Sequence, residues 1–490
     1  MAHDNTQTLT SPYNLARHYD AVALQNADFP AIIAEDAVLS HGEFRQIVLR
    51  IAGRLAADGV GPGSVVALNA SWMVATLGFL LATAHLGAGF IVASPVLART
   101  RAVVPTHFYR MPDMNGHPAV PFRLVTGDWF EADAPEFALQ ATDPDAPWLY
   151  LHTSGSTGTP KFIGLSQQMV RMRSRAAEAD FPFRGTTFAT YFESASRPFF
   201  ARALAALLQA CAIVDSRNPD FWLCCGVNLV AASPIQIIQA FGGSPLSSRI
   251  ARAEVSGARI PDGEAIRLLE SFDIVLDVYG ASETSKSFAN VITGDGFGAV
   301  VLKGQKLDSE IEIVDAAGNA VAPSMIGEVR VRNPYTAQGY IGDAASTAQA
   351  FRGGWFYPGD LACWSAQGAL QIVGRQDDVI NLGGYKIYGG LIDQLLTSVP
   401  GVRAAISLRN PVPGGTHMIL AFIVHEDPDN IWQTNEAIIS ICWERLGYRF
   451  SMQALRSIDA IPHDAKGSPD RRSCEKLVLA KAEEWGHLDR

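Results

Sequence analysis

The sequence has no cysteine pattern of the kind that holds a metal ion or builds a disulfide framework. Its six cysteines are scattered, without a Cys-x-x-Cys pair or another metal-ligand spacing. Such cysteines are typical of reduced thiols in a cytosolic protein. The first residues also lack a basic head followed by an apolar core, so no secretory signal is expected. We therefore expect a cytoplasmic protein with free thiols at Cys211, Cys224, Cys225, Cys363, Cys442 and Cys474.

An excess of basic residues is missing as well. Lysine and arginine number 39 against 49 aspartates and glutamates, which gives a formal net charge of −10. Binding to a nucleic-acid backbone requires a basic surface. The composition therefore argues against nucleic-acid binding as the main task of the protein.

The sequence also lacks a sustained apolar run that would span a membrane. Residues 74–97 are long enough on a simple count, but His85 and several glycine and serine residues interrupt them. The last part of the run, Phe90 to Val92, reads as a strand. We therefore expect a buried helix, a turn and a strand here, and no membrane span.

The chain is long enough for two or three domains, because 490 residues exceed what a single core usually supports. Residues 30–150, and again residues 180–300, alternate helical and strand patterns, which predicts α/β layers with parallel strands. The expected strands include 32–33, 37–39, 65–68, 212–214 and 274–278, and the expected helices include 41–58, 202–211 and 260–270.

A change of pattern follows at about residue 310, where short alternating strands such as 311–314 and 328–332 predict a β-rich region. Beyond residue 378 a small unit begins, with helices expected at 391–398 and 435–446 and strands at 404–408 and 418–424. The predicted fold class is therefore α/β. A large N-terminal domain, residues 1–376, would contain layered α/β subdomains and a β-rich subdomain, and a small mobile α+β C-terminal domain would span residues 377–490.

Residues 151–161, LHTSGSTGTPK, predict a phosphate-binding loop. An apolar strand is expected before the loop at 148–151 and a helix after it at 166–179, so the loop should lie where a strand passes into a helix. Glycines let backbone N–H groups approach phosphate oxygens, hydroxyl groups add donors, and Lys161 adds a positive charge. The spacing differs from that of the common nucleoside-triphosphatase loop. A surface linker rich in serine, threonine and glycine is the alternative.

Residues 278–284, VYGASET, predict a strand that ends in a tight glycine turn. Ligands of open parallel sheets bind beyond the carboxyl ends of the strands. Glu283 is therefore a candidate to hold Mg²⁺, and Tyr279 offers a flat ring and a hydroxyl group to a base or substrate. An ordinary acidic loop is the alternative when this motif is taken alone.

A third signature combines residues 354–361, GWFYPGDL, with residues 374–378, GRQDD. Asp360 is suited to accept hydrogen bonds from the two hydroxyl groups of a ribose. Arg375 is suited to bridge phosphate or ribose oxygens. A rigid turn with an exposed salt bridge is the alternative for either segment alone.

Together these segments resemble the family of ATP-dependent adenylate-forming enzymes, which comprises acyl- and aryl-CoA synthetases, adenylation domains of peptide synthetases, and luciferases. The resemblance runs from the N-terminal helices nearly to the C-terminus. It is carried by LHTSGSTGTPK (Leu151 to Lys161), YGASET (Tyr279 to Thr284), GEVRVRNPYTAQGYIGD (Gly327 to Asp343), GWFYPGDL (Gly354 to Leu361) and GRQDDVINLGGYKIYGGLID (Gly374 to Asp393).

The resemblance implies a two-step reaction in which a carboxylate attacks the α-phosphate of ATP, and a thiol then attacks the resulting acyl-adenylate. It implies ATP, Mg²⁺, and CoA or phosphopantetheine as cofactors, a small carboxylic acid as substrate, and CoA or a carrier protein as partner. The first step brings two anions together, so the site must supply cations and hydrogen-bond donors where charge develops.

The resemblance also implies roles for individual residues. Glu283 would hold Mg²⁺, Asp360 the ribose, and Arg375 the ribose or phosphates. Asp377 would be the hinge of the C-terminal domain, and Gly383 and Gly384 would let a phosphopantetheine arm pass close to the backbone. The remaining residues implied at the nucleotide are Thr153, Ser154, Gly155, Ser156, Thr157, Gly158, Thr159, Lys161, Tyr279, Gly280, Ser282 and Lys386, with Thr153 and Glu283 also in the catalytic group.

One departure from the family concerns its C-terminal catalytic lysine, which bridges the carboxylate and the α-phosphate. The expected position holds Ser468, and the nearest lysine is Lys466. Either Lys466 takes the role, or adenylation is impaired. Losing such a charged hydrogen bond typically slows a reaction by about 10²–10³-fold.

Other departures concern the substrate. Where many acyl- and aryl-CoA ligases have a histidine, this chain has Glu193, after Phe192. Glu193 would pair with a cationic group of the substrate, such as a β-amino group, or it would be solvated or paired with Arg197. Ser256 and Gly257 are also expected to line the acyl pocket, within the predicted pocket segments 192–200, 255–258 and 279–282.

A last departure is Gly389-Gly390-Leu391, which stands where relatives often have a proline followed by a glutamate. It suggests a surface adapted to a particular partner.

Two hypotheses follow. The first is a stand-alone ligase that forms a thioester on CoA or on the phosphopantetheine of a carrier protein. The second is a homologue that does not adenylate, and that binds or thioesterifies a preformed adenylate. Ser468 is the residue that separates them.

Overall fold

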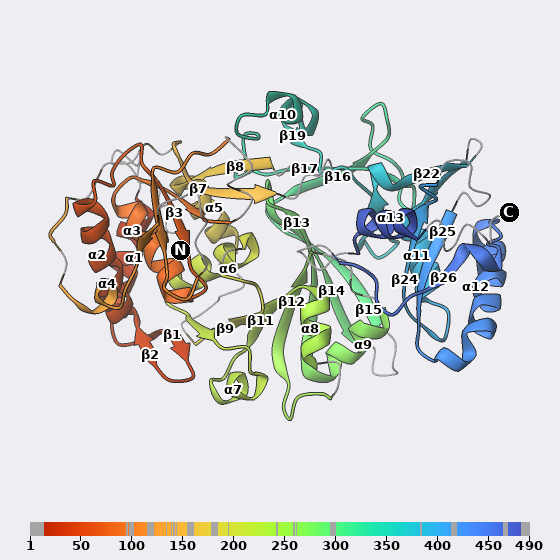
Figure 1. The fold of residues 1–490 in the computed structure, drawn as a ribbon, viewed down its shortest axis with the longest axis horizontal. Helices are drawn as coiled ribbons and strands as arrows, with labels where there is room; N and C mark the ends of the chain where they lie inside the picture. Colours follow the sequence, from red (N-terminus) through yellow and green to blue (C-terminus); the bar gives the residue numbers. More distant parts are fainter. Residues whose placement is uncertain are drawn as a thin grey trace, which may run out of the picture.

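The computed structural model describes most of the chain and defines several sheets with their helices (Figure 1). The described residues are 14–94, 97, 102–114, 122–133, 135–138, 140, 143, 145–153, 161–177, 185–194, 196–241, 244–257, 260, 262–294, 300–382, 385–412, 419–463 and 469–481.

The first sheet has the strand order β6-β5-β3-β4-β7-β8. Its strands are parallel except for β8, which pairs antiparallel with β7. This arrangement confirms the predicted α/β layering of the N-terminal part. The strands are β3 (Val65–Asn69), β4 (Gly89–Val92), β5 (His107–Arg110), β6 (Arg123–Leu124), β7 (Pro147–Thr153) and β8 (Lys161–Ser166).

The second sheet has the order β15-β14-β13-β12-β11-β9-β10-β1-β2. The central strands from β13 to β1 are parallel, while β14, β15 and β2 run antiparallel at the two edges. The strands are β1 (Pro30–Ala34), β2 (Val38–Ser40), β9 (Thr187–Thr190), β10 (Ala212–Asp215), β11 (Leu229–Ala232), β12 (Ile250–Ser256), β13 (Phe272–Ala281), β14 (Ser285–Gly294) and β15 (Val300–Lys306).

Helices cover these two sheets, and their sequences explain where they begin. At the start of α2, for example, the Ser40 hydroxyl accepts the N–H of Glu43 at 3.2 Å, and the Glu43 carboxylate accepts the N–H of Ser40 at 2.8 Å. The helices are α1 (Leu15–Gln25), α2 (His41–Ala57), α3 (Met73–His85), α4 (Asp128–Glu131), α5 (Gln167–Ala176), α6 (Arg197–Leu208), α7 (Pro219–Cys224), α8 (Pro234–Phe241) and α9 (Asp262–Ser271).

The prediction for residues 74–97 is confirmed, because α3 is followed by a turn and by β4. None of the helices in the described part of the chain combines the length and the apolar character needed to cross a membrane.

The expectation that the 154–160 loop leads from a strand into a helix is wrong. The loop joins β7 to the antiparallel strand β8, in which Lys161 lies opposite Thr153, and α5 begins only at Gln167. The segment KFIGLS is a short apolar run, and periodicity alone does not assign such a run to a strand or a helix.

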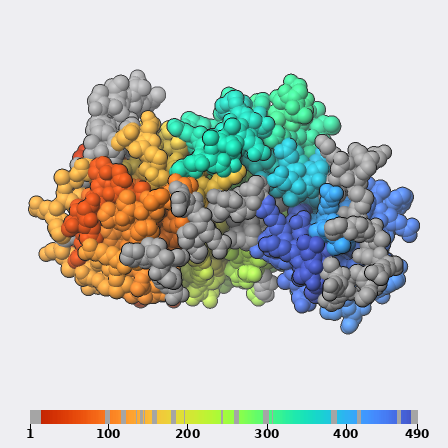
Figure 2. Space-filling view, turned by 45° about the horizontal axis from the view of Figure 1, so that its top comes forward, coloured from red at the N-terminus to blue at the C-terminus, as the bar shows by residue number. Residues whose placement is uncertain are grey.

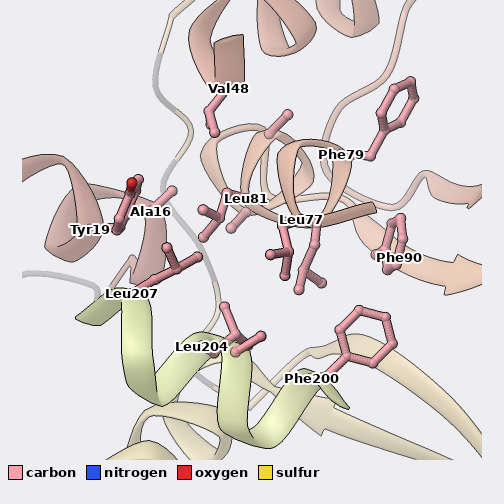
Figure 3. Close-up of a cluster of buried hydrophobic side chains, with 14 of the residues drawn as sticks. Ala16, Tyr19, Val48, Leu77, Phe79, Leu81, Phe90, Phe200, Leu204 and Leu207 are labelled. Carbon is pink, nitrogen blue, oxygen red and sulfur yellow. The ribbon is translucent and has the colours of Figure 1, made fainter. Parts of the chain in front are cut away.

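The main core lies where α6 packs against α3 and β4 (Figure 3). In this view Phe200, Leu204 and Leu207 of α6 point toward Leu77, Leu81 and Phe90, and all six side chains are buried. The labelled residues are Phe200, Leu204 and Leu207 on α6, Leu77 and Leu81 on α3, Phe90 on β4, Val48 and Phe79, and Ala16 and Tyr19 on α1.

An antiparallel sheet follows, which confirms the predicted β-rich region. Its strand order is β18-β19-β17-β20-β21, and β16 pairs with β17. Its elements are β16 (Glu310–Val314), β17 (Gly327–Arg332), α10 (Ala344–Ala350), β18 (Phe351–Arg352), β19 (Trp355–Phe356), β20 (Asp360–Trp364) and β21 (Leu370–Arg375).

The C-terminal residues form a unit with its own hydrophobic core, drawn in blue at one end of the molecule (Figures 1 and 2). Strands β24, β25 and β26 make one sheet, and β22 pairs with β23. The elements are a 3₁₀ turn (Gln376–Asp378), β22 (Val379–Leu382), β23 (Tyr385–Tyr388), α11 (Gly389–Thr397), β24 (Val402–Arg409), β25 (Ile419–His425), a 3₁₀ turn (Pro428–Asn430), α12 (Ile431–Leu446), a 3₁₀ turn (Met452–Ala454), β26 (Leu455–Ser457) and α13 (Arg471–Ala480). The boundary between residues 376 and 377 stays a prediction.

The core against α6 yields a test of stability. Leu204 is 1% exposed, so we expect Leu204→Ala to lower the free energy of unfolding by about 2–5 kcal/mol through lost burial and the cavity it leaves. Denaturant titration measures the change. The matched control is Leu24→Ala, because Leu24 is 65% exposed, and its effect should stay within about 0.5 kcal/mol. Equal losses in both variants would contradict this account of the core.

Candidate active site

Three of the predicted site residues lie at the turn between β13 and β14. Ser282 and Glu283 are in the turn itself, and Gly280 lies just before it, on β13. Strand β13 continues to Ala281 and β14 starts at Ser285, so the motif is the tip of a hairpin. A Cβ at position 280 would lie 2.2 Å from the backbone oxygen of Ser285. Only glycine allows this close approach, which explains the glycine of the motif.

A buried arginine on α5 fixes this turn. The Arg173 guanidinium donates to the backbone oxygens of Ser282 (2.9 Å), Glu283 (2.7 Å) and Tyr335 (3.1 and 3.0 Å). Arg173 is buried. In the sequence Arg173 is only part of a predicted helix, because nothing near it in the chain indicates its partners, which lie more than 100 residues away.

Tyr279, Asp360 and Arg375 form a hydrogen-bonded chain. The Tyr279 hydroxyl donates to one Asp360 oxygen at 2.7 Å, and Nη1 of Arg375 donates to the other at 2.7 Å. Nη1 of Arg375 also donates to the backbone oxygen of Pro358 at 2.6 Å. Burial and then the neighbouring Asp360 charge raise the pKa of Tyr279, so its hydroxyl stays protonated. The structure thus joins two of the predicted motifs.

Gly359 explains how Asp360 and Arg375 meet across β20 and β21. Its backbone has φ of +79°, a conformation that favours glycine, and a Cβ there would lie 3.1 Å from Nη2 of Arg375.

Glu283 is joined to Lys161 through Tyr340. The Tyr340 hydroxyl donates to Oε1 of Glu283 at 2.8 Å, and Nζ of Lys161 lies 4.9 Å from the centre of the Tyr340 ring. Burial and the Glu283 charge raise the pKa of Tyr340, which keeps it a donor. Tyr340 lies within the motif at 327–343, but the sequence gave it no role, because its contacts are with distant segments.

The donor set around Glu283 suits Mg²⁺ that is held chiefly by phosphate oxygens. Glu283 is a buried carboxylate, and no group of three or more His, Cys, Asp or Glu side chains suited to a metal occurs within the described ranges. Mg²⁺ at nucleotide sites typically takes one or two carboxylates together with substrate phosphates and water. The residues present therefore fit this ion.

Several predicted residues lie outside the described part of the chain. They are Ser154, Gly155, Ser156, Thr157, Gly158 and Thr159 of the phosphate loop, Gly383 and Gly384, and Lys466 and Ser468. Lys386 lies on β23 opposite Asn381, and its side chain is also outside that part. Thr153 is described; it is buried at the end of β7. Asp377 lies in the 3₁₀ turn after β21.

The chain on either side of residues 464–468 is well connected. His463 and Pro469 form an isolated antiparallel bridge, and the N–H of Asp470 donates to the backbone oxygen of Pro462 at 2.8 Å. Arg471 then donates to the Asp393 carboxylate, to the backbone oxygen of Ser407 at 3.0 Å and to Asp378 at 3.5 Å.

The structure corrects the partner expected for Glu193. Nη2 of Arg217, not Arg197, donates to its carboxylate at 2.5 Å, and both side chains are exposed. Glu193 follows β9 and Arg217 follows β10, which are parallel neighbours, so both residues emerge at the same edge. Phe192 lies instead beside Arg202, whose guanidinium is 5.6 Å from the ring centre.

A cavity adjoins the Glu283 turn and contains two residues of the predicted pocket segments, Gly280 on β13 and Ser256 at the end of β12. Gly257 follows with φ of +109°. The cavity also contains a buried carboxylate, Glu254, which sequence analysis missed because it lies within a strand. The described residues that line it are Arg173, Ala176, Ala177, Ala201, Arg202, Glu254, Ser256, Val278, Gly280, Ser285, Lys286, Leu307 and Tyr335.

The chain is similar in sequence to known ligases. The family of AMP-binding enzymes matches residues 115–341. The chain is 25% identical over 501 residues to a probable CoA ligase, CCL9, of Humulus lupulus, covering 92% of this chain and 93% of the relative. It is 23% identical over 515 residues to a 3-hydroxybenzoate–CoA ligase of Aromatoleum sp. (strain CIB), covering 93% and 94%.

The fold is also that of a solved relative. The O-succinylbenzoate coenzyme A synthetase of Bacillus subtilis, in complex with AMP, has a TM-score of 0.79 at 19% identity, covering 94% of this chain and 98% of the other. The fold, the connected motifs and the sequence matches define an ATP-dependent enzyme that activates acids. In sequence and fold the chain is similar to the adenylate-forming enzyme superfamily, whose AMP-binding family model matches residues 115–341, and the relatives named above are CoA ligases.

The close approach at Gly280 yields a prediction. We expect Gly280→Ala to lower the free energy of unfolding by about 1–3 kcal/mol, because the new Cβ would displace the backbone of Ser285. The matched control is Gly61→Ala, where a Cβ would meet nothing within 4 Å. Thermal or denaturant unfolding compares the two, and a Gly280→Ala protein as stable as the control would show that the hairpin tip is not tightly constrained.

The hydrogen bond between Tyr340 and Glu283 yields a second prediction for the site. We expect Tyr340→Phe to weaken MgATP binding by about 10-fold, because the carboxylate loses the hydrogen bond that orients it. Calorimetry with MgATP and without any acid measures this directly. Tyr150→Phe is the control, since the Tyr150 hydroxyl has no hydrogen bond to another residue among those described. Unchanged MgATP affinity in Tyr340→Phe would remove Tyr340 from the site.

Proposed function

We propose that this chain is an AMP-forming acid–thiol ligase that activates a carboxylic acid on ATP and transfers the acyl group to the thiol of CoA. One observation carries the proposal: residues of separate motifs are linked around the tip of one hairpin, through Tyr279–Asp360–Arg375 and through Glu283–Tyr340–Lys161. The CoA ligases among its relatives support CoA as the acceptor. A carrier-protein phosphopantetheine is the alternative acceptor.

In the first step, a carboxylate oxygen of the acid attacks the α-phosphorus, and the bond to pyrophosphate breaks. The loop from Thr153 to Lys161 would supply N–H groups, hydroxyls and one cation to the β- and γ-phosphates as charge moves onto pyrophosphate. Glu283 would hold Mg²⁺, which neutralises phosphate charge when it is bound.

The ribose and the second step involve other residues. Asp360 would accept the ribose hydroxyls, because an ionised carboxylate has lone pairs beyond those that Tyr279 and Arg375 use. The thiol then attacks the acyl carbon, and AMP leaves. Asp377 would be the hinge about which residues 377–490 reorient between the two steps, and Gly383 and Gly384 would allow the arm that bears the thiol to pass.

We further propose that Lys466 supplies the cation that the family places at the position of Ser468. With Lys466 in this role the chain would adenylate its acid, unlike a homologue that does not adenylate. The CoA ligases among the relatives support this assignment.

Pyrophosphate release from ATP with a panel of carboxylic acids tests the proposed function. We expect release that depends on the acid, and acyl-CoA in the presence of CoA. If the thioester forms only on a carrier protein, then the acceptor is the phosphopantetheine of that protein and not CoA. Absence of release with every acid, together with thioester formation from a preformed adenylate, would establish the alternative.

The pyrophosphate-release assay also tests the proposed role of Lys466. We expect Lys466→Met to slow pyrophosphate release by about 10²–10³-fold, because the transition state loses a charged donor. Adding Ser468→Lys to this variant should restore release. The control is Lys476→Met, an exposed lysine of α13, which should leave the rate unchanged. An active Lys466→Met enzyme would assign the role elsewhere.

A further inference from the structure

The cavity beside the Glu283 turn, which we call the turn cavity, lies between the helices α5 and α6 and the ends of β12, β13 and β14. Gly280 lines it, and Arg173, which lines it too, binds the backbone oxygens of Ser282 and Glu283. The turn cavity is therefore directly next to the hairpin tip at which the nucleotide is proposed to bind.

The charged side chains of the turn cavity have partners within the chain. Glu254 accepts hydrogen bonds from Nε of Arg202 at 3.0 Å and from Nζ of Lys286 at 2.9 Å. Arg202 also donates to the backbone oxygen of Pro198 at 3.3 Å, and Arg173 donates to the backbone oxygens of the turn. Because these groups are already paired, they do not require a charged group on the substrate.

A second cavity adjoins the turn cavity. Arg173, Ala201 and Ser285 line both, so these residues stand at the boundary between the two. The second cavity lies between α5, α6 and the strands β7 and β8. We call it the apolar cavity, because its other described lining residues are buried and, apart from Ser174, apolar. The apolar ones are Leu149, Leu151, Leu165, Val170, Phe200 and Leu204.

The polar side chains that α5 contributes to the apolar cavity are directed to other partners. The Ser174 hydroxyl donates to the backbone oxygen of Val170 at 3.0 Å, within the helix. The Arg173 guanidinium donates to the backbone oxygens of Ser282, Glu283 and Tyr335. Water needs about two to four polar partners to occupy a cavity. The apolar cavity therefore suits apolar atoms better than it suits water.

Ala201 lies at the boundary because of its place on α6. Successive residues of an α-helix are rotated by about 100° from one another. Arg202 lines the turn cavity and Phe200 lines the apolar cavity, while Ala201, between them in the sequence, lines both. The side chain of alanine ends at Cβ, so a larger residue at position 201 would project into the boundary and separate the two cavities.

We propose that the acid has an uncharged apolar tail, which extends from the turn cavity past Ala201 into the apolar cavity. This inference rests on the proposed function, which it makes more specific. Burial of the tail removes apolar surface from water and fills a space in which the lining side chains lack neighbouring atoms. A tail that ends in a charged or amide group is disfavoured, because that group would lose its water without gaining hydrogen bonds from the apolar lining. Ala201 is the specificity-determining residue.

The test compares acids that differ in the length and the polarity of the tail. Straight-chain acids from acetate to decanoate are assayed for pyrophosphate release beside acids of the same length that end in an amide or a second carboxylate. Benzoate, beside its 4-carboxamide and terephthalate, forms an aryl arm. We expect kcat/KM to rise about 4-fold for each CH₂ group that is buried, up to an optimum length, and to fall beyond it.

Polarity of the tail gives the second outcome of this comparison. The best apolar acid should exceed its polar-ended counterparts about 10-fold or more, because a polar group buried without partners is costly. Such a preference in either arm supports the inference, and the arm in which it occurs tells an alkyl tail from an aryl one. Polar-ended acids used as well as apolar ones in both arms, or rates that do not depend on the tail, would overturn the inference.

A variant pair assigns the preference to the boundary between the cavities. Ala201→Leu should lower kcat/KM for the best apolar acid about 10-fold or more, because the added atoms occupy the path of the tail, and it should leave kcat/KM for acetate within about 3-fold. Ala201→Gly should retain the preference or move the optimum to a longer chain. A purely structural role of Ala201 would lower the activity with every acid alike, which would also overturn the inference. The matched control is Ala437→Leu, at an exposed alanine of α12, and its preference should equal that of the wild type.

Two readouts keep failure of folding and failure of the proposed function apart from failure of the inference. Thermal unfolding of each variant shows whether it is folded. If Ala201→Leu does not fold, the wild-type series still decides. Absence of pyrophosphate release with every acid would count against the proposed function itself, whereas release with polar-ended acids or with acetate alone would count only against the apolar tail.

Discussion

The arrangement of the site depends on one buried guanidinium. Arg173 comes from the helix that follows the first sheet, and it binds backbone oxygens of the β13–β14 turn and of the segment after β17. These segments lie more than 100 residues apart from it in the sequence. A buried arginine that lost these partners would leave several unsatisfied donors. The position of the turn is therefore determined by hydrogen bonds to main-chain atoms, and Glu283 takes its place from that turn.

The local elements of the fold were largely accessible from sequence, and the connections between them were less so. Alternating patterns located α2, β3, β10 and β17 to within a few residues, because each element buries one face with a characteristic period. The strand that follows the phosphate loop, β8, was missed, whereas the helix expected at 166–179 is present as α5. Six residues cannot display a helical period, and the pairing of Lys161 with Thr153 depends on how β8 returns along β7.

The residues proposed to bind the nucleotide were also more accessible from sequence than those that line the cavity beside the turn. Its motifs are contiguous, so Tyr279, Glu283, Asp360 and Arg375 are recognisable one by one, and the structure then shows how they connect. The cluster of Arg202, Glu254 and Lys286 draws single residues from three elements, none of which has a distinctive neighbourhood in sequence. Glu193 shows the same limit, because its partner is adjacent across two parallel strands and not along the chain.

The glycine pair at the start of α11 shows how a departure from the family pattern acquires a physical reason. The sequence suggested a surface adapted to a partner. In the structure α11 packs against β21, and a Cβ on Gly390 would lie 2.1 Å from the backbone oxygen of Val373. Any other residue at position 390 would push the two elements apart, so the glycine serves a contact within this chain. If residues 377–490 reorient about Asp377, this contact must open. At Gly390 the two elements meet through backbone atoms, which bury little apolar side-chain surface, so this point adds little to the cost of separation.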